Sequence, residues 1–344
     1  MREIETTKAA GHILCHDITQ IIKGEKKGPV FRKGHVVREE DIPVLLSVGK
    51  EHLYVWEKTE GNLHENEGAQ ILRDICKNEY MSESEIKEGK IELTAQTDGL
   101  FKIDRKKLLA VNSLGEMMIA SRHGDFPVKK GDKLAGMRII PLVIEEEKME
   151  RAKEAAKGAP VFQILPYREK KAGIVTTGSE ISKGLIQDTF GPVIEKKLGE
   201  FPVEIMGQVY PGDNKEKITE EILGFIEQGA DLVVCTGGMS VDPDDRTPGA
   251  IKDTGAEIIS YGAPVLPGAM LLVAYYKKDG KNIPIVGLPG CVMYAKRTVF
   301  DLVLPRIMAD DPIEREELAA LGEGGLCLNC DVCTFPNCGF GKGR

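Results

Sequence analysis

Long apolar runs, a signal peptide and an excess of basic residues are all missing from this sequence. No apolar stretch approaches the roughly 20 residues that a helix needs to cross a bilayer. The N-terminus, M-R-E-I-E-T-T-K, lacks the apolar core of a signal peptide. The formal net charge of -8 argues against a general nucleic-acid binder, whose surface would be basic. We therefore expect a cytoplasmic protein that has neither a membrane nor a nucleic acid as its partner.

The length of the chain and the change of residue pattern along it indicate two domains. At 344 residues it exceeds what one compact core usually supports, and its 29% charged and 42% hydrophobic residues are ordinary for a soluble protein. Short apolar runs broken by turns occupy the first half, and strand, glycine turn and helix alternate in the second. We predict a β-rich α+β region with a connecting helix over residues 1–165, an α/β domain over 166–309, and a linker with a cysteine-rich tail over 310–344.

The alternation in the second half predicts the architecture of the α/β domain. Ala172–Thr176 and Leu232–Cys235 are short apolar runs, typical of strands that are buried on both faces, and Val203–Val209 is expected to form another strand. Such a pattern predicts a three-layer α/β/α domain with a mostly parallel sheet. Gly287–Cys291 is expected to open a last helix that runs to about Met308. Because these folds bind ligands at the carboxyl ends of their strands, the glycine-rich loops that follow the strands are the candidate site.

One such loop lies in the stretch Asp231–Ile251, D-L-V-V-C-T-G-G-M-S-V-D-P-D-D-R-T-P-G-A-I. Its two glycines, Gly237 and Gly238, allow a tight turn after the strand. Thr247 followed by proline predicts a helix start with Thr247 as the N-cap. A helix start presents free amide donors to an anion, and the Ser240 hydroxyl and the Arg246 guanidinium would add to them. The loop is therefore a candidate phosphate site.

Three carboxylates in the same loop indicate a metal ion beside that phosphate. Asp242, Asp244 and Asp245 would repel a phosphate unless a hard cation lay between the two, so we expect Mg²⁺ there. A capped surface loop whose acids are merely solvated explains the same residues without any ligand.

Four of the eight cysteines crowd the C-terminal tail. Cys327, Cys330, Cys333 and Cys338 follow the pattern C-x2-C-x2-C-x4-C, whereas the other four are scattered and read as buried small hydrophobes. Four thiolates within twelve residues suit tetrahedral Zn²⁺ or an iron–sulfur cluster. Ferredoxin-type runs have three residues before the last cysteine and a proline after it, which this tail does not. A disordered thiol-rich tail explains the same residues without any metal, and the identity of a tail metal stays open.

Three loops carry a resemblance to a known family. Thr177–Ile181, T-G-S-E-I, is similar to the motif T-G-[DS]-E-L. Gly237–Val241, G-G-M-S-V, is similar to G-G-[VT]-S-V, and Gly287–Gly290 reads G-L-P-G. In this order and spacing they resemble the molybdopterin-binding domain that molybdopterin molybdenumtransferases and molybdopterin adenylyltransferases share. The resemblance covers about residues 170–308, and three loops in the same order are far more specific than any one of them.

The resemblance implies the ligands and the roles of the site. It implies a transferase of molybdenum cofactor biosynthesis that binds molybdopterin and Mg²⁺, with ATP or molybdate as a second substrate. A homo-oligomer and a molybdenum enzyme as partner are also expected. Asp245 and Asp188 match the acids of the motifs D-x-T-P-x-A and D-x-x-G-P and are the implied catalytic residues. The implied cofactor-binding residues are Thr177, Gly178, Ser179, Glu180, Gly237, Gly238, Ser240, Asp242, Arg246, Thr247, Pro267, Gly268, Leu288, Pro289 and Gly290.

The sequence also departs from the molybdenumtransferase pattern. The loop K-P-G-K-P of those enzymes reads L-P-G-A-M here, so Leu266 and Ala269 replace two lysines. Losing such charge-assisted contacts costs about 1.5 to 3 kcal/mol each. Residues 1–165 lack the segment D-G-[YF]-A of the molybdenumtransferases. Binding of molybdopterin is therefore better supported than its chemical conversion.

Three functions remain open at this point. The first is an enzyme that transfers AMP to molybdopterin or inserts metal into it. The second is a non-catalytic molybdopterin carrier, chaperone or sensor, which the missing lysines favour. The third is a nucleotide pyrophosphatase, because the pattern G-G-x5-D-D over residues 237–245 also resembles the competence-damage-inducible pyrophosphatases.

Overall fold

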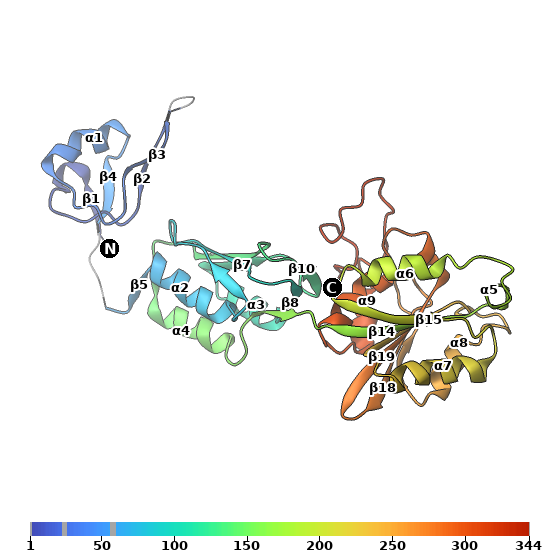
Figure 1. Ribbon diagram of the computed structural model, residues 1–344. Coiled ribbons are helices and arrows are strands. Elements are labelled where there is room, and N and C mark those ends of the chain that lie inside the picture. The colour runs from blue at the N-terminus through green and yellow to red at the C-terminus, as the bar shows by residue number, and fades with distance from the viewer. Residues whose placement is uncertain (1, 23–25, 56–59, 344) are drawn as a thin grey trace. The chain divides into compact units, whose positions relative to one another are not determined.

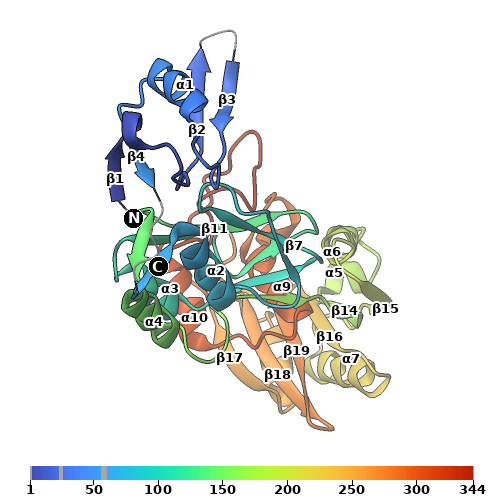
Figure 2. The same ribbon diagram turned by 90° about the vertical axis from the view of Figure 1, so that its left-hand side faces the viewer.

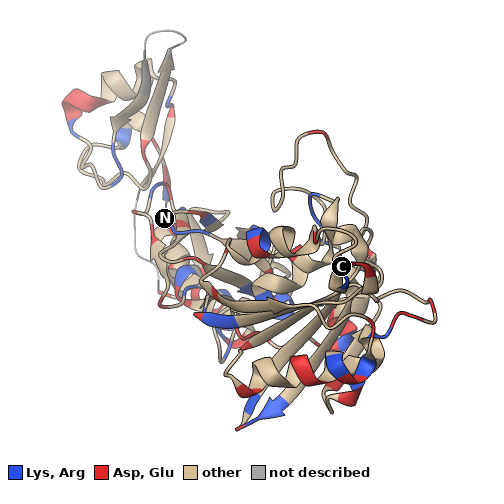
Figure 3. Ribbon diagram, turned by 45° about the vertical axis from the view of Figure 1, so that its right-hand side comes forward, with Lys and Arg blue, Asp and Glu red and all other residues tan. Residues whose placement is uncertain are grey.

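The computed structural model describes residues 2–22, 26–55 and 60–343, which divide into two compact units (Figures 1 and 2). Unit 1 comprises Met1–Gln96, Ile103–Arg122 and Lys130–Gln163, and unit 2 comprises Thr97–Lys102, His123–Lys129 and Ile164–Arg344. Charged residues of both signs are mixed over the elements of each unit (Figure 3). None of the helices in the described ranges is long and apolar enough to cross a membrane.

Within the described residues, unit 1 is built from small antiparallel sheets, four α-helices and two short 3-10 helices. Its sheets pair β1 with β4, β2 with β3 and β5 with β12, and a larger sheet has the order β6-β7-β11-β9. This confirms the predicted β-rich α+β region. Its helices and strands are β1 (Arg2–Glu5), η1 (Thr6–Lys8), β2 (Ile18–Ile22), β3 (Lys26–Phe31), η2 (Glu39–Asp41), α1 (Ile42–Ser47), β4 (His52–Val55), β5 (Asn62–His64), α2 (Glu65–Cys76), β6 (Met81–Glu83), β7 (Ile91–Ala95), α3 (Arg105–Asn112), β9 (Met117–Ser121), β11 (Lys133–Ile139), β12 (Val143–Glu145) and α4 (Glu146–Ala155).

Unit 2 holds a six-stranded sheet and a three-stranded sheet of order β10-β8-β13, of which the last strand begins in unit 1. Its strands are β8 (Gly99–Ile103), β10 (Phe126–Val128), β13 (Phe162–Pro166), β14 (Lys170–Thr176), β15 (Val203–Val209), β16 (Leu232–Thr236), β17 (Glu257–Tyr261), β18 (Leu272–Lys278) and β19 (Lys281–Leu288). Its helices are α5 (Ser179–Ser182), α6 (Phe190–Leu198), α7 (Lys215–Glu227), α8 (Thr247–Asp253), η3 (Gly290–Met293), α9 (Val299–Met308), α10 (Arg315–Ala319) and η4 (Ala320–Gly322).

The six-stranded sheet has helices on both faces, as predicted. Its order is β15-β14-β16-β19-β18-β17, and the first four of these strands are parallel. Apolar residues of α6 and α9 pack on one face, and those of α7 and α8 pack on the other (Figure 1). Gly173 allows α7 to pack closely on the sheet, because a Cβ at this position would lie 2.3 Å from the Phe225 ring on α7. The domain is therefore a three-layer α/β/α fold.

The last long helix differs from its prediction. It begins at Val299, whereas Gly290–Met293 forms only a short 3-10 turn. The physical reason is a capping box: Thr298 accepts from the Phe300 amide, and Asp301 accepts from the Thr298 amide. The G-L-P-G loop is thus not part of α9 and lies at the edge of the sheet.

Residues 310–325 are packed against the domain instead of forming an extended linker. They include α10, and Ile313 and Leu318 are buried in the core beneath the sheet. Arg306 of α9 holds this segment by donating to Asp311 at 2.5 Å and to Glu317 at 2.8 Å. The tail that follows is therefore anchored to unit 2.

Candidate functional site

Three neighbouring parallel strands end at the same level. In the register of the sheet, Thr176 of β14 lies beside Thr236 of β16, and Thr236 lies beside Leu288 of β19. The loops that begin at Thr177, Gly237 and Pro289 therefore start side by side at the carboxyl edge. The loop after β17 reaches the same edge, because β17 runs antiparallel to β18, which runs antiparallel to β19. This confirms the predicted gathering of the glycine-rich loops at one edge.

The loops after β14 and β16 are joined by hydrogen bonds. The Thr177 amide donates to the Thr236 carbonyl at 2.8 Å, and the hydroxyls of Thr177 and Thr247 lie 3.1 Å apart. The Thr247 hydroxyl also donates to the Gly237 carbonyl at 2.8 Å. Thr177 and Thr247 are both buried. These two predicted residues thus hold the loops together from beneath.

The glycines of the second loop are required by this close approach. Gly237 has a φ of 80°, and a Cβ there would lie 2.5 Å from the Thr177 carbonyl oxygen. Gly238 has a φ of 53°, and its Cβ would lie 3.0 Å from the Thr247 hydroxyl. Residues other than glycine rarely adopt such a backbone conformation, and a side chain at either position would also push the two loops apart.

Thr247 is not the N-cap that its position before proline predicts. The helix α8 already includes Thr247, and the N-cap residue is Arg246, which makes no side-chain capping bond. The Thr247 hydroxyl is directed back to Gly237 and Thr177, so it cannot serve the first turn of the helix. Its role in this structure is to join two loops.

The acidic part of the loop is exposed and folds on itself. Asp245 accepts a hydrogen bond from the Asp242 amide at 2.9 Å, and the Asp245 amide donates to the Asp242 carbonyl at 2.9 Å. Ser240, Asp242, Asp244 and Arg246 are exposed. The side chains that would meet a ligand therefore face solvent, and Asp245 also shapes the turn.

Tyr261, which the sequence analysis did not single out, supports this loop. Its hydroxyl, at the end of β17, donates to the carbonyls of Met239 at 2.9 Å and Ser240 at 3.2 Å. Partial burial, followed by the charge of Asp245, raises the pKa of Tyr261, so the hydroxyl remains a donor.

Asp188 organises the neighbouring part of the edge. Its carboxylate accepts from the amides of Phe190 at 2.8 Å and Gly191 at 3.0 Å, at the start of α6. It also accepts from the Gln208 amide group at 2.7 Å and from the Tyr210 hydroxyl at 3.3 Å, both from the end of β15. Burial and the Asp188 charge raise the pKa of Tyr210. Asp188 is therefore engaged in positioning bonds, and its catalytic role stays a prediction.

Gln208 and Tyr210 were missed from the sequence because a strand pattern does not show which polar side chain turns towards a neighbouring loop. The signal that could have found them is their place at the end of a strand, directly before Pro211–Gly212. Gln208 also donates to the Thr176 hydroxyl at 2.7 Å, which ties β15 to β14 at this edge.

The first loop forms a short turn of helix. Gly178 has a φ of 126°, and the Ser179 amide donates to the Asp213 carboxylate at 2.7 Å. Ser179 is half-buried and Glu180 is exposed, so both lie where a ligand at the edge could reach them.

The G-L-P-G loop contributes backbone more than side chains. Leu288 and Pro289 are buried, and Gly290 is exposed. A Cβ on Gly287 would lie 2.6 Å from the Met239 side chain, which packs the second loop against this one. The second loop is thus in contact with both the first and the third.

The loop after β17 is fastened to α9. Gly268 has a φ of 128°, and a Cβ there would lie 2.4 Å from a methyl group of Val299. The Val299 amide donates to the Pro267 carbonyl at 3.1 Å. Gly268 is buried, so it shapes this loop and leaves ligand contact to its neighbours.

The predicted metal ligands do not converge on a single ion. No three carboxylate, imidazole or thiol groups within residues 2–22, 26–55 and 60–343 are close enough to hold one metal ion. Asp242 and Asp244 are exposed, and the Asp245 carboxylate accepts a backbone amide. Cys330 and Cys333 are exposed, and Cys327 and Cys338 are half-buried. The Mg²⁺ and tail-metal sites therefore stay predictions.

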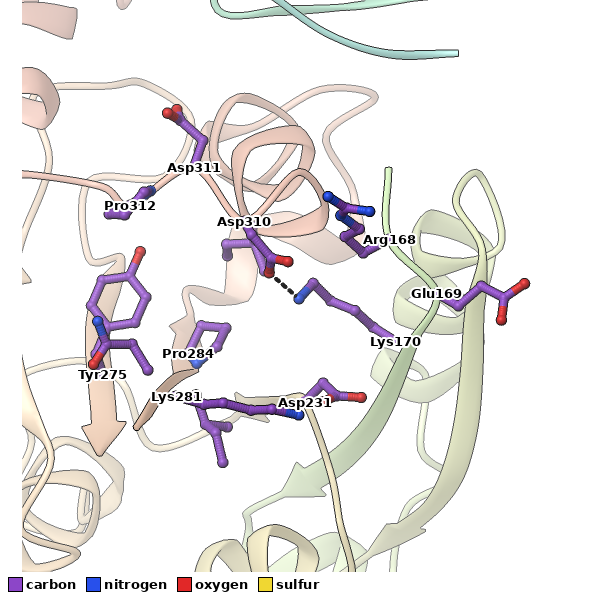
Figure 4. A pocket seen from close by; sticks show the side chains of 13 residues that line it. Arg168, Glu169, Lys170, Asp231, Tyr275, Lys281, Pro284, Asp310, Asp311 and Pro312 are labelled. Carbon is purple, nitrogen blue, oxygen red and sulfur yellow. Dashed lines mark hydrogen bonds and ion pairs between the residues drawn. The ribbon is translucent and has the colours of Figure 1, made fainter. Parts of the chain in front are cut away.

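A cavity of about 440 Å³ lies at the opposite, amino edge of the sheet (Figure 4). Lys170, Asp231 and Lys281 line it at the starts of β14, β16 and β19. Lys170 points to Asp310 and forms an ion pair with it at 2.5 Å. None of the residues predicted for the site lines this cavity. The loops at the carboxyl edge therefore remain the candidate site, although this cavity is large.

Two segments of the chain match known families. Residues 173–309 match the family described as "probable molybdopterin binding domain", which contains all three loops of the carboxyl edge. Residues 3–57 match a family described only as a domain of unknown function.

Individual relatives match to different extents. A molybdopterin molybdenumtransferase of Staphylococcus epidermidis is 27% identical over 325 residues, which cover 87% of this chain and 71% of that protein. A CinA-like protein of Mycobacterium tuberculosis is 40% identical over 77 residues, which cover 22% of this chain and 18% of that protein. The second match thus spans less than a fifth of the length of that relative.

Solved structures resemble the chain only in part. The tungsten cofactor synthesizing protein MoaB of Pyrococcus furiosus aligns with a TM-score of 0.32 and 22% identity, over 36% of this chain and 84% of that one. The protein CinA of Thermoplasma acidophilum aligns with a TM-score of 0.31 and 21% identity, over 40% of this chain and 98% of that one.

Proposed function

We propose that the chain binds molybdopterin at the carboxyl edge and inserts metal into it, because residues 173–309 match the family described as a probable molybdopterin binding domain. The observation that carries the proposal is the meeting of the three loops at one edge: the Thr177–Thr247 contact at 3.1 Å joins the first two, and Met239 packs the second against the third. The long match to a molybdenumtransferase favours metal insertion over other reactions of the family.

Each part of the edge has a distinct task in this proposal. The exposed Ser240 and Arg246 and the half-buried amides of Gly237 and Gly238 bind the phosphate of molybdopterin. Asp242, Asp244 and Asp245 hold Mg²⁺ once the phosphate supplies further oxygen ligands, since Mg²⁺ is commonly bound through one or two carboxylates plus phosphate. The substrates are molybdopterin and molybdate, and a molybdenum enzyme receives the product. The active form is a cytoplasmic homo-oligomer.

The experiment is anaerobic incubation of the purified chain with molybdopterin, Mg²⁺ and molybdate, followed by reconstitution of a molybdenum-free molybdoenzyme with the product. Metal insertion predicts that the enzyme regains activity in proportion to the chain added. Tight binding without any conversion would instead support a carrier or chaperone, a function that the replacement of two loop lysines by Leu266 and Ala269 favours.

Adenylyl transfer is the second candidate, favoured by the segment Asp245–Ala250 with its D-x-T-P-x-A pattern. It predicts Mg²⁺-dependent transfer of AMP from ATP to molybdopterin. The pattern G-G-x5-D-D over residues 237–245 favours nucleotide pyrophosphatase activity as a weaker candidate. Release of pyrophosphate or phosphate from nucleotides in the absence of any pterin would identify that activity.

The variant Asp245→Asn separates charge from loop shape. An asparagine oxygen can still accept from the Asp242 amide, so the turn is retained while the negative charge is removed. We expect Asp245→Asn to abolish the Mg²⁺-dependent turnover and to leave the thermal unfolding midpoint within a few degrees of wild type. Isotope-labelled product formation measures the first and circular dichroism the second. Full turnover in Asp245→Asn would show that the Asp245 carboxylate is not needed at the Mg²⁺ site.

A further inference from the structure

The cysteine-rich tail is a closed loop packed on unit 2. The Gly341 amide donates to the Gly324 carbonyl at 2.9 Å, so the two ends of the loop meet. Phe340 is buried, and the Phe335 ring lies 5.8 Å from the ring of Phe126 on β10. Gly341 lets the chain approach α9, because a Cβ there would lie 2.5 Å from a methyl group of Leu302. The tail loop is therefore packed against unit 2 through specific contacts.

All four tail cysteines line one cavity of about 250 Å³ inside this loop. Cys327 and Cys338 are half-buried, and Cys330 and Cys333 are exposed. The rest of the wall is formed mainly by Phe335 and other apolar side chains, together with Lys296 and Arg297. A pocket in which four thiols face a common space has the chemistry of a thiolate-ligated metal centre.

The cavity is attached to two loops of the carboxyl edge. The Leu266 amide donates to the Gly325 carbonyl, and the Cys327 amide donates to the Leu266 carbonyl, both at 2.8 Å. Lys296, in the loop between β19 and α9, donates to the carbonyls of Cys330 at 3.1 Å and Asp331 at 2.8 Å. The loops that carry Gly268 and Pro289 thus also position the thiol cavity.

The cysteine spacing in the sequence favours one kind of metal centre. The run C-x2-C-x2-C is the spacing of ferredoxin-type clusters, although the fourth cysteine follows after four residues. No three potential ligand groups among the described residues are close enough to hold one metal ion, so the tail cysteines must move together when a metal centre binds.

We propose that the tail binds a [4Fe–4S] cluster through Cys327, Cys330, Cys333 and Cys338, beside the carboxyl edge. Four thiolates make such a centre anionic, and Lys296 brings a positive charge to the cavity wall while holding the Cys330–Asp331 segment. Arg297 is already paired with Asp301 at 2.8 Å and lies over the Phe335 ring, so it supports the wall. The segment 328–334, which carries Cys330 and Cys333, is exposed.

The test is anaerobic reconstitution of the full chain with equal amounts of Fe²⁺ and Fe³⁺ and with sulfide, without any pterin. We expect about four iron and four sulfide per chain and the visible absorption of an iron–sulfur cluster. Cys330→Ser and Cys333→Ser each lose most of the iron and absorption; because both side chains are exposed, the variants keep the wild-type fold by circular dichroism. Cys291→Ser, a half-buried thiol outside the cavity, is the matched control and retains the cluster.

A second variant tests the contribution of Lys296. Removing one charge-assisted hydrogen bond corresponds to about a tenfold change in an equilibrium constant, so Lys296→Met should lose iron to a chelator about tenfold more readily. Lys252→Met, at an exposed position on α8, should behave as wild type.

Three results would overturn the cluster. They are one zinc per chain without sulfide, no stoichiometric metal at all, or equal loss of iron in Cys291→Ser and Cys330→Ser. Because the readouts are iron, sulfide and absorption, the result does not depend on whether the chain binds molybdopterin.

Discussion

Gly237→Ala is expected to weaken molybdopterin binding by about 10- to 100-fold. The new Cβ would lie 2.5 Å from the Thr177 carbonyl oxygen, so the loops after β14 and β16 must separate. That movement removes at least one charge-assisted hydrogen bond to the phosphate, worth about 1.5 to 3 kcal/mol, which corresponds to this range of affinity. Titration of the chain with molybdopterin under anaerobic conditions measures the change.

The matched control for this substitution is Gly255→Ala. Gly255 has a φ of 84°, close to the 80° of Gly237, and no heavy atom lies within 4 Å of the position of its Cβ. Gly255 precedes β17 at the amino edge of the sheet. An alanine at this position would therefore cause similar backbone strain without touching the loops. If Gly255→Ala weakened binding as much as Gly237→Ala does, the effect would come from lost stability and not from the loops.

Asp301→Ala is expected to lower the free energy of unfolding by about 3 to 5 kcal/mol. Asp301 is 6% exposed and accepts two bonds from Lys197 at 2.8 Å; Lys197 is itself 8% exposed. Removing one partner of a buried ion pair leaves the other charge buried and uncompensated. The substitution also removes the capping bond from the Thr298 amide, where α9 begins. Denaturant unfolding followed by circular dichroism measures the loss.

The control for this prediction is Asp253→Ala. Asp253 is half-exposed and pairs with Lys215 at 2.6 Å on the surface, so its loss should change the free energy of unfolding by less than about 1 kcal/mol. Equal losses in the free energy of unfolding for Asp301→Ala and Asp253→Ala would show that the buried pair stabilises the fold no more than a surface pair does.

The sequence predicted the sheet well because its signal is local. β15 spans the predicted Val203–Val209, and β14 and β16 contain the predicted apolar runs. Each run is too short for a helix and is followed by glycines, which is sufficient to place a buried parallel strand and its loop. The gathering of the loops followed from the rule for parallel sheets and needed no knowledge of side chains.

The parts that were missed depend on contacts between distant segments. Thr247 reads as an N-cap from its proline neighbour, yet its hydroxyl contacts Thr177, seventy residues earlier in the chain. Likewise, the bond from Gln208 to Asp188 cannot be read from the alternation of a strand. The start of the last helix is a different case: T-x-x-D at Thr298 is a recognisable capping pattern, but the G-L-P-G loop seemed to offer an earlier start.

Hydrogen–deuterium exchange of the chain with and without molybdopterin tests the central claim most directly, because it locates the ligand without any substitution. Binding at the carboxyl edge predicts slower exchange in residues 177–180, 237–247 and 289–293, and unchanged exchange in residues 281–284 and 310–312 around the amino-edge cavity. Slower exchange at the amino-edge cavity with none at the three loops would contradict the proposed site.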